Sequence, residues 1–214
     1  NATPIILGSN KHETKLFTLM TPWFTHRIFG LPVRLKNRDD YFQSVKYGSL
    51  YWKALAVDEI ASVLTDSQQP SVYAYRFDWG NLSNFVTLDL QDLLGGAHAL
   101  ELPFVFGNLD LLETALVLAD QDAARNLSDS MMSYWAEFAH TGNPSTGRDG
   151  ELTLWKPWSN AQEEERQIIF DEADYGGVRL SADRVNFDAI VNELIADEAL
   201  DSETKCELSN GMFP

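Results

Sequence analysis

The sequence predicts an α/β fold in which mostly parallel strands are flanked by helices. Two observations support this. The run Thr3–Gly8 is short, apolar and closed by glycine, a pattern typical of a strand covered on both faces. A long helical pattern and a second strand follow it, and a strand, helix and strand in this order favour parallel pairing through a crossover connection.

The long helix is predicted over Asp39–Leu64, although Gly48 weakens the pattern in its first half. One stripe of this helix is expected to be buried and holds Val45, Trp52, Leu55, Ala56, Ile60 and Val63. The stretch Ser71–Trp79 is β-branched and aromatic and lies between turn-forming pairs, which predicts the second strand. Residues 81–96 are predicted to form a loop that ends in a Gly-Gly pair.

Three further elements are predicted in the second half of the chain. A helix over Ala123–Thr141 has apolar side chains at helical spacing and ends at Gly142, followed two residues later by a proline. Gln167–Phe170 is a short apolar strand. A terminal helix over Asp183–Ala196 is expected to bury Phe187, Ile190, Val191, Leu194 and Ile195.

Composition narrows the range of partners. The chain carries 16 basic and 32 acidic side chains, so its formal net charge is −16. Nucleic acids and anionic membranes are bound through basic patches, so neither is expected as a partner. The single cysteine, Cys206, leaves no internal disulfide. No apolar run approaches the ~20 residues of a membrane-spanning helix.

Two titratable residues follow strand-like segments in a suggestive order. Glu13 comes after the first strand and His98 after the Gly-Gly pair, 98 − 13 = 85 residues later. In α/β-hydrolases the catalytic residues run along the chain as serine, acid and histidine. Spacing alone is weak support, because a lone glutamate or histidine in a loop is usually a solvated residue.

Four stretches together resemble the type-B carboxylesterases, the family of the cholinesterases and the bacterial p-nitrobenzyl-type esterases. Gly8-Ser-Asn-Lys-His-Glu13 is similar to the family's Gly-x-Asn-Lys-Asp-Glu-Gly. The stretch 96–107 resembles its Gly-x-x-His-Gly-x-Glu motif and the Phe-Val-Phe-Gly that follows. The stretches 134–144 and 155–158 resemble its Trp-x-x-Phe-Ala-x-x-Gly-x-Pro and Trp-Pro-x-Tyr/Trp.

The resemblance implies a role for five residues. Glu13 matches the catalytic acid and His98 the catalytic base of a serine esterase that acts through an acyl-serine intermediate. Glu101 matches a glutamate three residues after the histidine and is a candidate hydrogen-bonding group behind the pair. Leu16 and Phe17 follow the acid where apolar side chains line the substrate pocket in the family. The implied substrate is a small-molecule carboxylic ester, with no metal and no organic cofactor.

Several positions depart from the family pattern. His12 stands where aspartate is usual, and glycine is usual at both Thr14 and Ala99. Thr14 is expected to tighten the turn after Glu13, and Ala99 to crowd the pocket floor. His12 and His140 are expected to be surface residues, with His12 as the nearest rival for the base.

The family's nucleophile elbow, Gly-x-Ser-x-Gly, does not occur, because no serine has glycine two residues away on both sides. We therefore expect residues 3–214 to be the C-terminal portion of a single type-B carboxylesterase domain, inactive alone, with residues 1–2 as an expression-tag remnant. A sheet cut in mid-order leaves an unpaired edge, so self-association is expected.

Two alternatives stay open at this point. The domain is a non-catalytic relative that binds proteins, as in cholinesterase-like adhesion domains, or His98 and Glu101 bind a metal together with His12 and Glu13. Metal binding by His98 and Glu101 requires that both residues lie on one helix, and Pro103 argues against a helix there. The natural ester and the cellular location are not encoded in any pattern here.

Overall fold

The computed structural model describes residues 3–67, 71–84, 88–110, 112 and 118–212. Its central sheet has the strand order β1 (Ile5–Asn10), β4 (Val72–Phe77), β5 (Gln167–Phe170) and β6 (Arg179–Ser181). The first three strands are parallel, and β6 is antiparallel to β5. The predicted α/β class with mostly parallel strands is confirmed. Strand β6 was not predicted, because three residues are too few to display a period.

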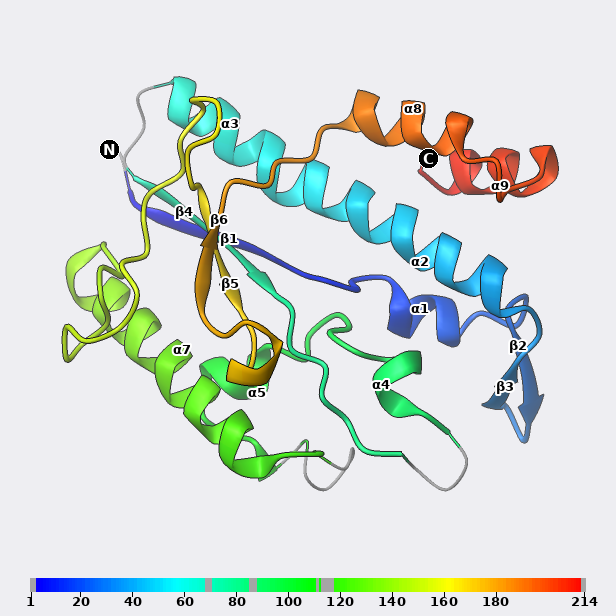
Figure 1. Cartoon of the computed structure of the whole chain (residues 1–214), viewed down its shortest axis with the longest axis horizontal. Helices are drawn as coiled ribbons and strands as arrows, with labels where there is room; N and C mark the ends of the chain where they lie inside the picture. Colours follow the sequence, from blue (N-terminus) through cyan, green and yellow to red (C-terminus); the bar gives the residue numbers. More distant parts are fainter. Residues whose placement is uncertain (1–2, 68–70, 85–87, 111, 113–117, 213–214) are drawn as a thin grey trace.

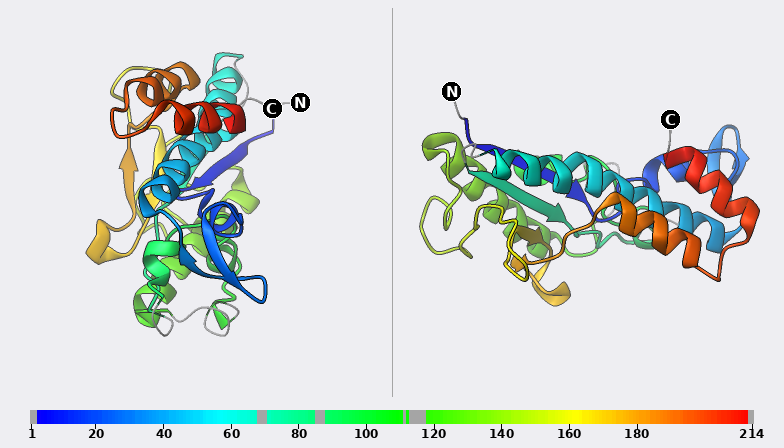
Figure 2. Two further views of the ribbon diagram at one scale, coloured as in Figure 1. Left: turned by 90° about the vertical axis from the view of Figure 1, so that its right-hand side faces the viewer. Right: turned by 90° about the horizontal axis from the view of Figure 1, so that it is seen from above.

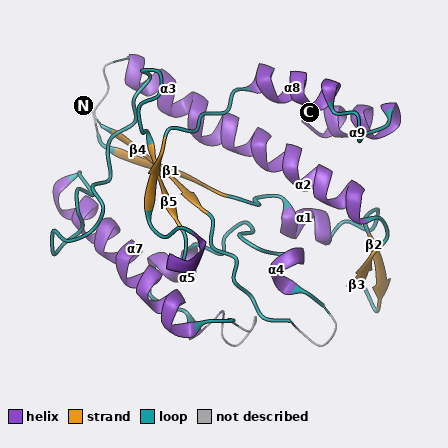
Figure 3. Ribbon diagram, viewed as in Figure 1, coloured by secondary structure: helices purple, strands orange, loops and turns teal. Residues whose placement is uncertain are grey.

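Helices cover both faces of the sheet (Figures 1 and 3). One face carries α2 (Arg38–Lys53), a π-helical turn at Ala54–Asp58 and α3 (Glu59–Asp66). The other carries α5 (Leu102–Val105) and α7 (Gln121–Thr141). Alternate residues of β4 belong to different clusters, as the strand period requires: Val72 and Ala74 pack with Val57 and Ala61, whereas Tyr73 and Phe77 pack with Phe104, Met131 and Tyr134.

The long helix is present, but its predicted buried stripe is wrong at four of six positions. Trp52, Leu55, Ile60 and Val63 are all at least 37% exposed. Val45 is buried as predicted, and the other buried apolar positions are Tyr41, Tyr47, Ala54, Val57 and Ala61. A π-turn holds one residue more than an α-turn, so it shifts every later position by about 100° around the axis. A single period of 3.6 residues therefore does not describe the whole helix.

Helix α7 confirms the second helix prediction. Asp120 caps its start by accepting a hydrogen bond from the Ala123 amide at 2.9 Å. At its end, Gly142 has φ +76° and donates its amide to the Phe138 carbonyl at 2.7 Å. Glycine is favoured there because this left-handed conformation costs other residues free energy.

The C-terminal region holds two helices rather than one. Helix α8 spans Phe187–Ala196 and starts at Asn186, whose side chain accepts from the Ala189 amide, so the predicted start at 183 is four residues early. Ile190 and Leu194 are buried as predicted, but Ile195 is 65% exposed. Helix α9 (Ser202–Met212) was not predicted, because its sequence is polar.

A small β-hairpin lies at the same end of the molecule as α8 and α9, as Figure 2 shows. Strands β2 (Thr25–Ile28) and β3 (Leu31–Leu35) form it, and it follows α1 (Lys15–Leu19). Helix α4 (Leu90–Leu93) is one turn within the predicted loop 81–96, and a 3-10 turn lies at Ala173–Tyr175. None of the described helices has the length and apolar character to cross a membrane.

Candidate active site

The site is built where the loops after β1 and β4 meet. These strands are neighbours and run parallel, so both loops leave the sheet at the same edge. His12 and Ala97 form an isolated parallel bridge, and the His12 amide donates to the Gly96 carbonyl at 2.9 Å. The next residues along the two loops are Glu13 and His98, and the bridge therefore sets them side by side.

Glu13 and His98 are in hydrogen-bond contact. Glu13 Oε2 lies 2.7 Å from His98 Nδ1, and the two side chains are 5% and 39% exposed. With the carboxylate on Nδ1, that nitrogen carries the proton and Nε2 is left to accept one. Burial raises the pKa of Glu13, while hydrogen bonds from the Asn10 amide and from His98 act in the opposite direction.

Glu101 is linked to Glu13 and to the loop of His98 by the hydrogen bonds of Asn10. The Asn10 side-chain amide donates to Glu101 Oε2 at 2.6 Å and to the Ala97 carbonyl at 2.6 Å. The Asn10 backbone amide donates to Glu13 Oε1 at 2.7 Å. Asn10 thus ties the acid to the histidine loop. It was not among the predicted site residues, although it lies within the motif that ends at Glu13.

Two aromatic rings flank the imidazole. The ring centroids of Phe17 and Trp52 each lie 5.2 Å from that of His98, and the two rings are stacked 6.4 Å apart. Phe17 was a predicted site residue. Trp52 was instead assigned to the helix core, because its spacing in α2 matched an amphipathic stripe. Nothing in the sequence pattern marks it as a neighbour of His98.

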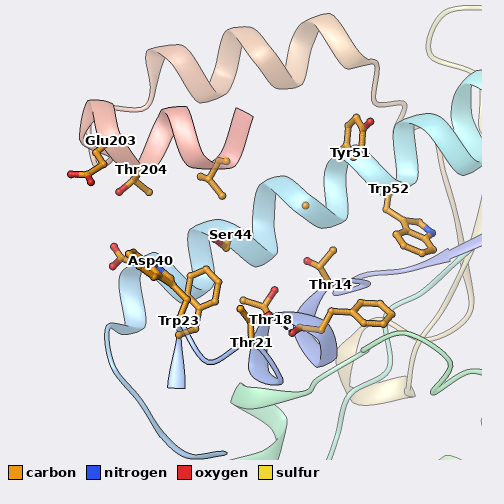
Figure 4. Close-up of a pocket in the computed structure, with 14 residues that line it drawn as sticks. Thr14, Thr18, Thr21, Trp23, Asp40, Ser44, Tyr51, Trp52, Glu203 and Thr204 are labelled. Atoms are coloured by element: carbon orange, nitrogen blue, oxygen red, sulfur yellow. Dashed lines mark hydrogen bonds between the residues drawn. The ribbon is translucent and has the colours of Figure 1, made fainter. Parts of the chain in front are cut away.

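A cavity of about 730 Å³ opens beside these rings, between α1, α2 and α9 (Figure 4). Phe17 and Trp52 are part of the cavity wall, and these two rings connect the cavity to the imidazole of His98. Leu16 does not line the cavity. Asp40 and Glu203 are its charged residues, and it has no lysine or arginine. The remaining wall is aromatic or small and polar: Thr14, Thr18, Thr21, Trp23, Phe24, Ser44, Gly48, Tyr51, Thr204 and Leu208.

The positions that depart from the family pattern have separate explanations. Thr14 has φ −89°, which needs no glycine, and its hydroxyl donates to the Val45 carbonyl at 3.2 Å, tying α1 to α2. Ala99 has φ +67°, in the left-handed region where an alanine costs about 1 kcal/mol more than glycine.

His12 and His140 differ in their environments. His140 is exposed as expected. His12 is half-buried rather than exposed, and burial together with Lys15 and Lys11 lowers its pKa to about 3. An imidazole held neutral this strongly is a poor proton acceptor near neutral pH, so His12 does not rival His98 as the base.

The metal alternative was tested against side-chain positions. In the part of the chain that the structure describes, no group of three or more histidine, cysteine, aspartate or glutamate residues is placed to hold a metal ion. Pro103 does not prevent a helix here, contrary to the prediction, because α5 forms with Pro103 in its first turn, where proline is tolerated.

A mostly parallel sheet with an acid and a histidine after neighbouring strands defines an α/β-hydrolase type of protein. The chain belongs to the carboxylesterase family, since the sequence profile of the "Carboxylesterase family" matches residues 32–185. The matched segment contains His98 and Glu101, and Glu13 precedes it.

Two relatives agree with this assignment by sequence. The chain is 30% identical over 188 residues to the para-nitrobenzyl esterase of Bacillus subtilis, which covers 80% of this chain and 34% of that protein. It is 36% identical to the acetylcholinesterase of Bungarus fasciatus, covering 78% and 31%. A solved thermophilic PNB esterase has a TM-score of 0.49, 25% identity and coverage of 96% and 38%. The chain thus spans about a third of the length of these relatives.

Proposed function

We propose that this chain supplies the acid and the general base of a serine carboxylic ester hydrolase. The 2.7 Å contact between Glu13 and His98 carries the proposal. Because the sequence lacks Gly-x-Ser-x-Gly, the nucleophilic serine belongs to a segment outside these 214 residues. In this proposal residues 3–214 are the C-terminal portion of one carboxylesterase domain. Retention of a contacting acid–histidine pair favours an enzyme over a non-catalytic binding domain.

The chemistry follows from the arrangement of the pair. His98 Nε2 removes the proton of the serine hydroxyl as its oxygen attacks the ester carbonyl carbon, and then returns that proton to the leaving alkoxide. Water repeats the sequence on the acyl-serine and releases the carboxylic acid. Glu13 holds the imidazole in one tautomer and stabilises the imidazolium, and Asn10 keeps the carboxylate oriented.

The cavity beside His98 is the proposed site for an apolar group of the ester. Its aromatic wall, which includes Phe17 and Trp52, favours a ring or a branched alkyl group. Its carboxylates, Asp40 and Glu203, disfavour an anionic substituent. Leu16 stays a predicted contact outside this wall. The names of the relatives make a p-nitrobenzyl ester a suitable first substrate.

The test replaces each member of the pair in the complete enzyme that contains the serine. In His98→Ala, the rate of ester hydrolysis is expected to fall until only a ~10³–10⁴-fold acceleration over the uncatalysed reaction in water remains. Oxyanion stabilisation and substrate binding supply this remaining acceleration. Glu13→Gln is expected to cost less, since the base remains. The quantity measured is kcat/KM on a p-nitrobenzyl ester, with a circular dichroism spectrum to verify folding.

The matched control is His140→Ala, which removes an exposed histidine at the end of α7 and should leave kcat/KM unchanged. Normal turnover by a folded His98→Ala enzyme would overturn the proposed role of the pair.

A further inference from the structure

A second cavity, of about 480 Å³, lies along the Gly95–Gly96 turn and shares no lining residue with the cavity beside His98. Its wall is polar and includes Lys11, His12 and Lys15. The proposed hydrolysis uses none of these three side chains.

Lys15 is a buried amine without an acidic partner. The residue is 4% exposed. Its Nζ donates one long hydrogen bond, 3.4 Å, to the Gln91 carbonyl and lies 5.7 Å from the centre of the Phe42 ring. Among the described residues, no carboxylate lies within ion-pair distance of it. An ammonium group has three donors and a full charge, so this environment satisfies it poorly.

A second nitrogen faces the same place. His12 Nδ1 is buried and has no hydrogen-bond partner. A Cβ atom built on Gly95 would lie 2.8 Å from His12 Nδ1 and 3.0 Å from Lys15 Nζ, so both nitrogens converge on this glycine. Its φ of +46° and the absence of a side chain allow that approach. The site therefore has a donor amine and an imidazole nitrogen without a hydrogen-bond partner beside a polar cavity.

Burial, rather than the surrounding charges, favours the uncharged form of Lys15. Burial lowers the pKa of Lys15 to about 8, and Lys11 acts in the same direction, whereas Asp92 and Asp89 oppose it. The nearby His12 imidazole is neutral. Part of the Lys15 population is therefore a free amine near neutral pH, and a free amine is the nucleophilic form.

Lys53 provides a comparison within the same chain. It is also 4% exposed, but its Nζ lies 2.5 Å from Asp58 Oδ2. Burial lowers its pKa, and the contact with Asp58 opposes that effect. The two lysines thus share burial and differ in the presence of an acidic partner.

We propose that Lys15 is a site of N-acylation by small, polar acyl donors, such as activated esters, that enter this cavity. The lone pair of Nζ attacks the carbonyl carbon, the C–N bond forms and the C–O bond to the leaving group breaks. The nitrogen loses its proton to the departing oxyanion through solvent. The product amide is uncharged and has a single N–H, for which the Gln91 carbonyl and His12 Nδ1 are acceptors.

The test measures the acylation rate of each lysine. The folded chain is treated at pH 7.5 with limiting N-hydroxysuccinimidyl acetate, and acetylation is followed by peptide mass spectrometry. Lowering an amine pKa from 10.5 to about 8 raises its free-base fraction at pH 7.5 roughly 200-fold, and we expect at least about 10-fold to survive the lower nucleophilicity and restricted access. Lys15 should therefore react at least about 10-fold faster than the exposed Lys36, and Lys53 should be the slowest.

Two controls make the result decisive. In urea the rates of Lys15, Lys36 and Lys53 should become similar, because the difference depends on the folded site. Lys11→Arg should retain the fast acetylation at Lys15, whereas Lys15→Arg should remove the fast component and leave the other rates unchanged. A folded chain in which Lys53 is protected and Lys15 reacts no faster than Lys36 would overturn the proposal.

Discussion

Both carboxylate oxygens of Glu13 are engaged, Oε1 by the backbone amide of Asn10 and Oε2 by the imidazole of His98. A carboxylate held at two points cannot rotate without breaking a buried hydrogen bond, so it fixes the ring plane of its partner. Asn10 is the last residue of β1 and lies three residues before Glu13. The same short stretch therefore supplies the acid and the group that orients it.

His12 gives a prediction about stability and pH. Its pKa is lowered from 6.5 to about 3 in the folded protein, so below pH 6.5 the unfolded chain binds a proton that the folded chain does not. The stability it contributes is present above pH 6.5 and is lost as the pH falls. His12→Gln removes this loss. We expect the stability of the variant relative to the unchanged chain to rise by about 2 kcal/mol between pH 6.5 and pH 5.

Urea unfolding at several pH values measures this difference. His140→Gln, at an exposed position, is the matched control and should leave the pH slope unchanged. Parallel curves for the unchanged chain and His12→Gln would contradict the neutral state of the buried imidazole.

The sequence located the central pair but not its surroundings. Glu13 and His98 were predicted from motifs that lie in single stretches of chain. Trp52 reaches His98 only through the packing of α2 against the loop after β1, which no local pattern records. The same holds for Asn10 and Glu101, whose contact spans 91 residues of sequence.

At the scale of elements, the ring of Tyr75 on β4 lies over Gly8 on β1, in space that a side chain at residue 8 would need. Gly8 is in register with Tyr75, and a Cβ on Gly8 would lie 1.9 Å from the tyrosine ring. That ring is held in turn by Trp135, Trp155 and Phe170. Glycine at position 8, inside β1, is therefore required by the packing of the Tyr75 ring.

Gly8→Ala is expected to destabilise the fold by about 1–3 kcal/mol, because the Tyr75 ring has to move within a packed cluster. In a Tyr75→Ala background the added methyl group has room, and Gly8→Ala should cost much less there. The free energy of unfolding of all four chains, measured in urea, gives the coupling. Additive effects of the two substitutions would mean that the close approach does not limit stability.

Strand and helix predictions succeeded where one period held throughout an element. Strand β5 has the predicted bounds and α7 differs at its start by two residues, because apolar spacing and caps agree there. The buried stripe of the first long helix failed from Leu55 onward at its π-turn, whose extra residue leaves no signature in composition, whereas Trp52 lies before that turn and packs against His98. Helix α9 failed for a different reason, since packing against α2 and α8 stabilises a segment without a strong apolar stripe.

For the whole molecule, two apolar features are uncovered. Strand β1 pairs only with β4 in the described sheet, and Ile5, Ile6 and Leu7 are half-buried. The hairpin region exposes a second group, Trp23, Ile28, Phe29, Leu31 and Val33. Open strand edges and clustered apolar side chains both favour association.

We therefore expect the isolated chain to form dimers or larger assemblies at micromolar concentration, measured by light scattering. Phe29→Glu is the comparison variant, because it charges a fully exposed hairpin position and leaves β1 unaltered. Association that persists in this variant assigns the contact to β1, and loss of association assigns it to the hairpin. A chain that stays monomeric contradicts the expectation.

The open side of β1 has a further consequence for the exchange of amide hydrogens. The amides of Ile5 and Lys11 donate toward β4, and amides alternate along a strand, so those of Ile6 and Gly8 face outward. Asn10 also faces outward, but its amide is already bound to Glu13. Deuterium should therefore enter Ile6 and Gly8 early and their odd-numbered neighbours late. Pairing along this edge would slow exchange at Ile6 and Gly8 and leave Asn10 unchanged, since the acid already occupies the last outward donor of the strand.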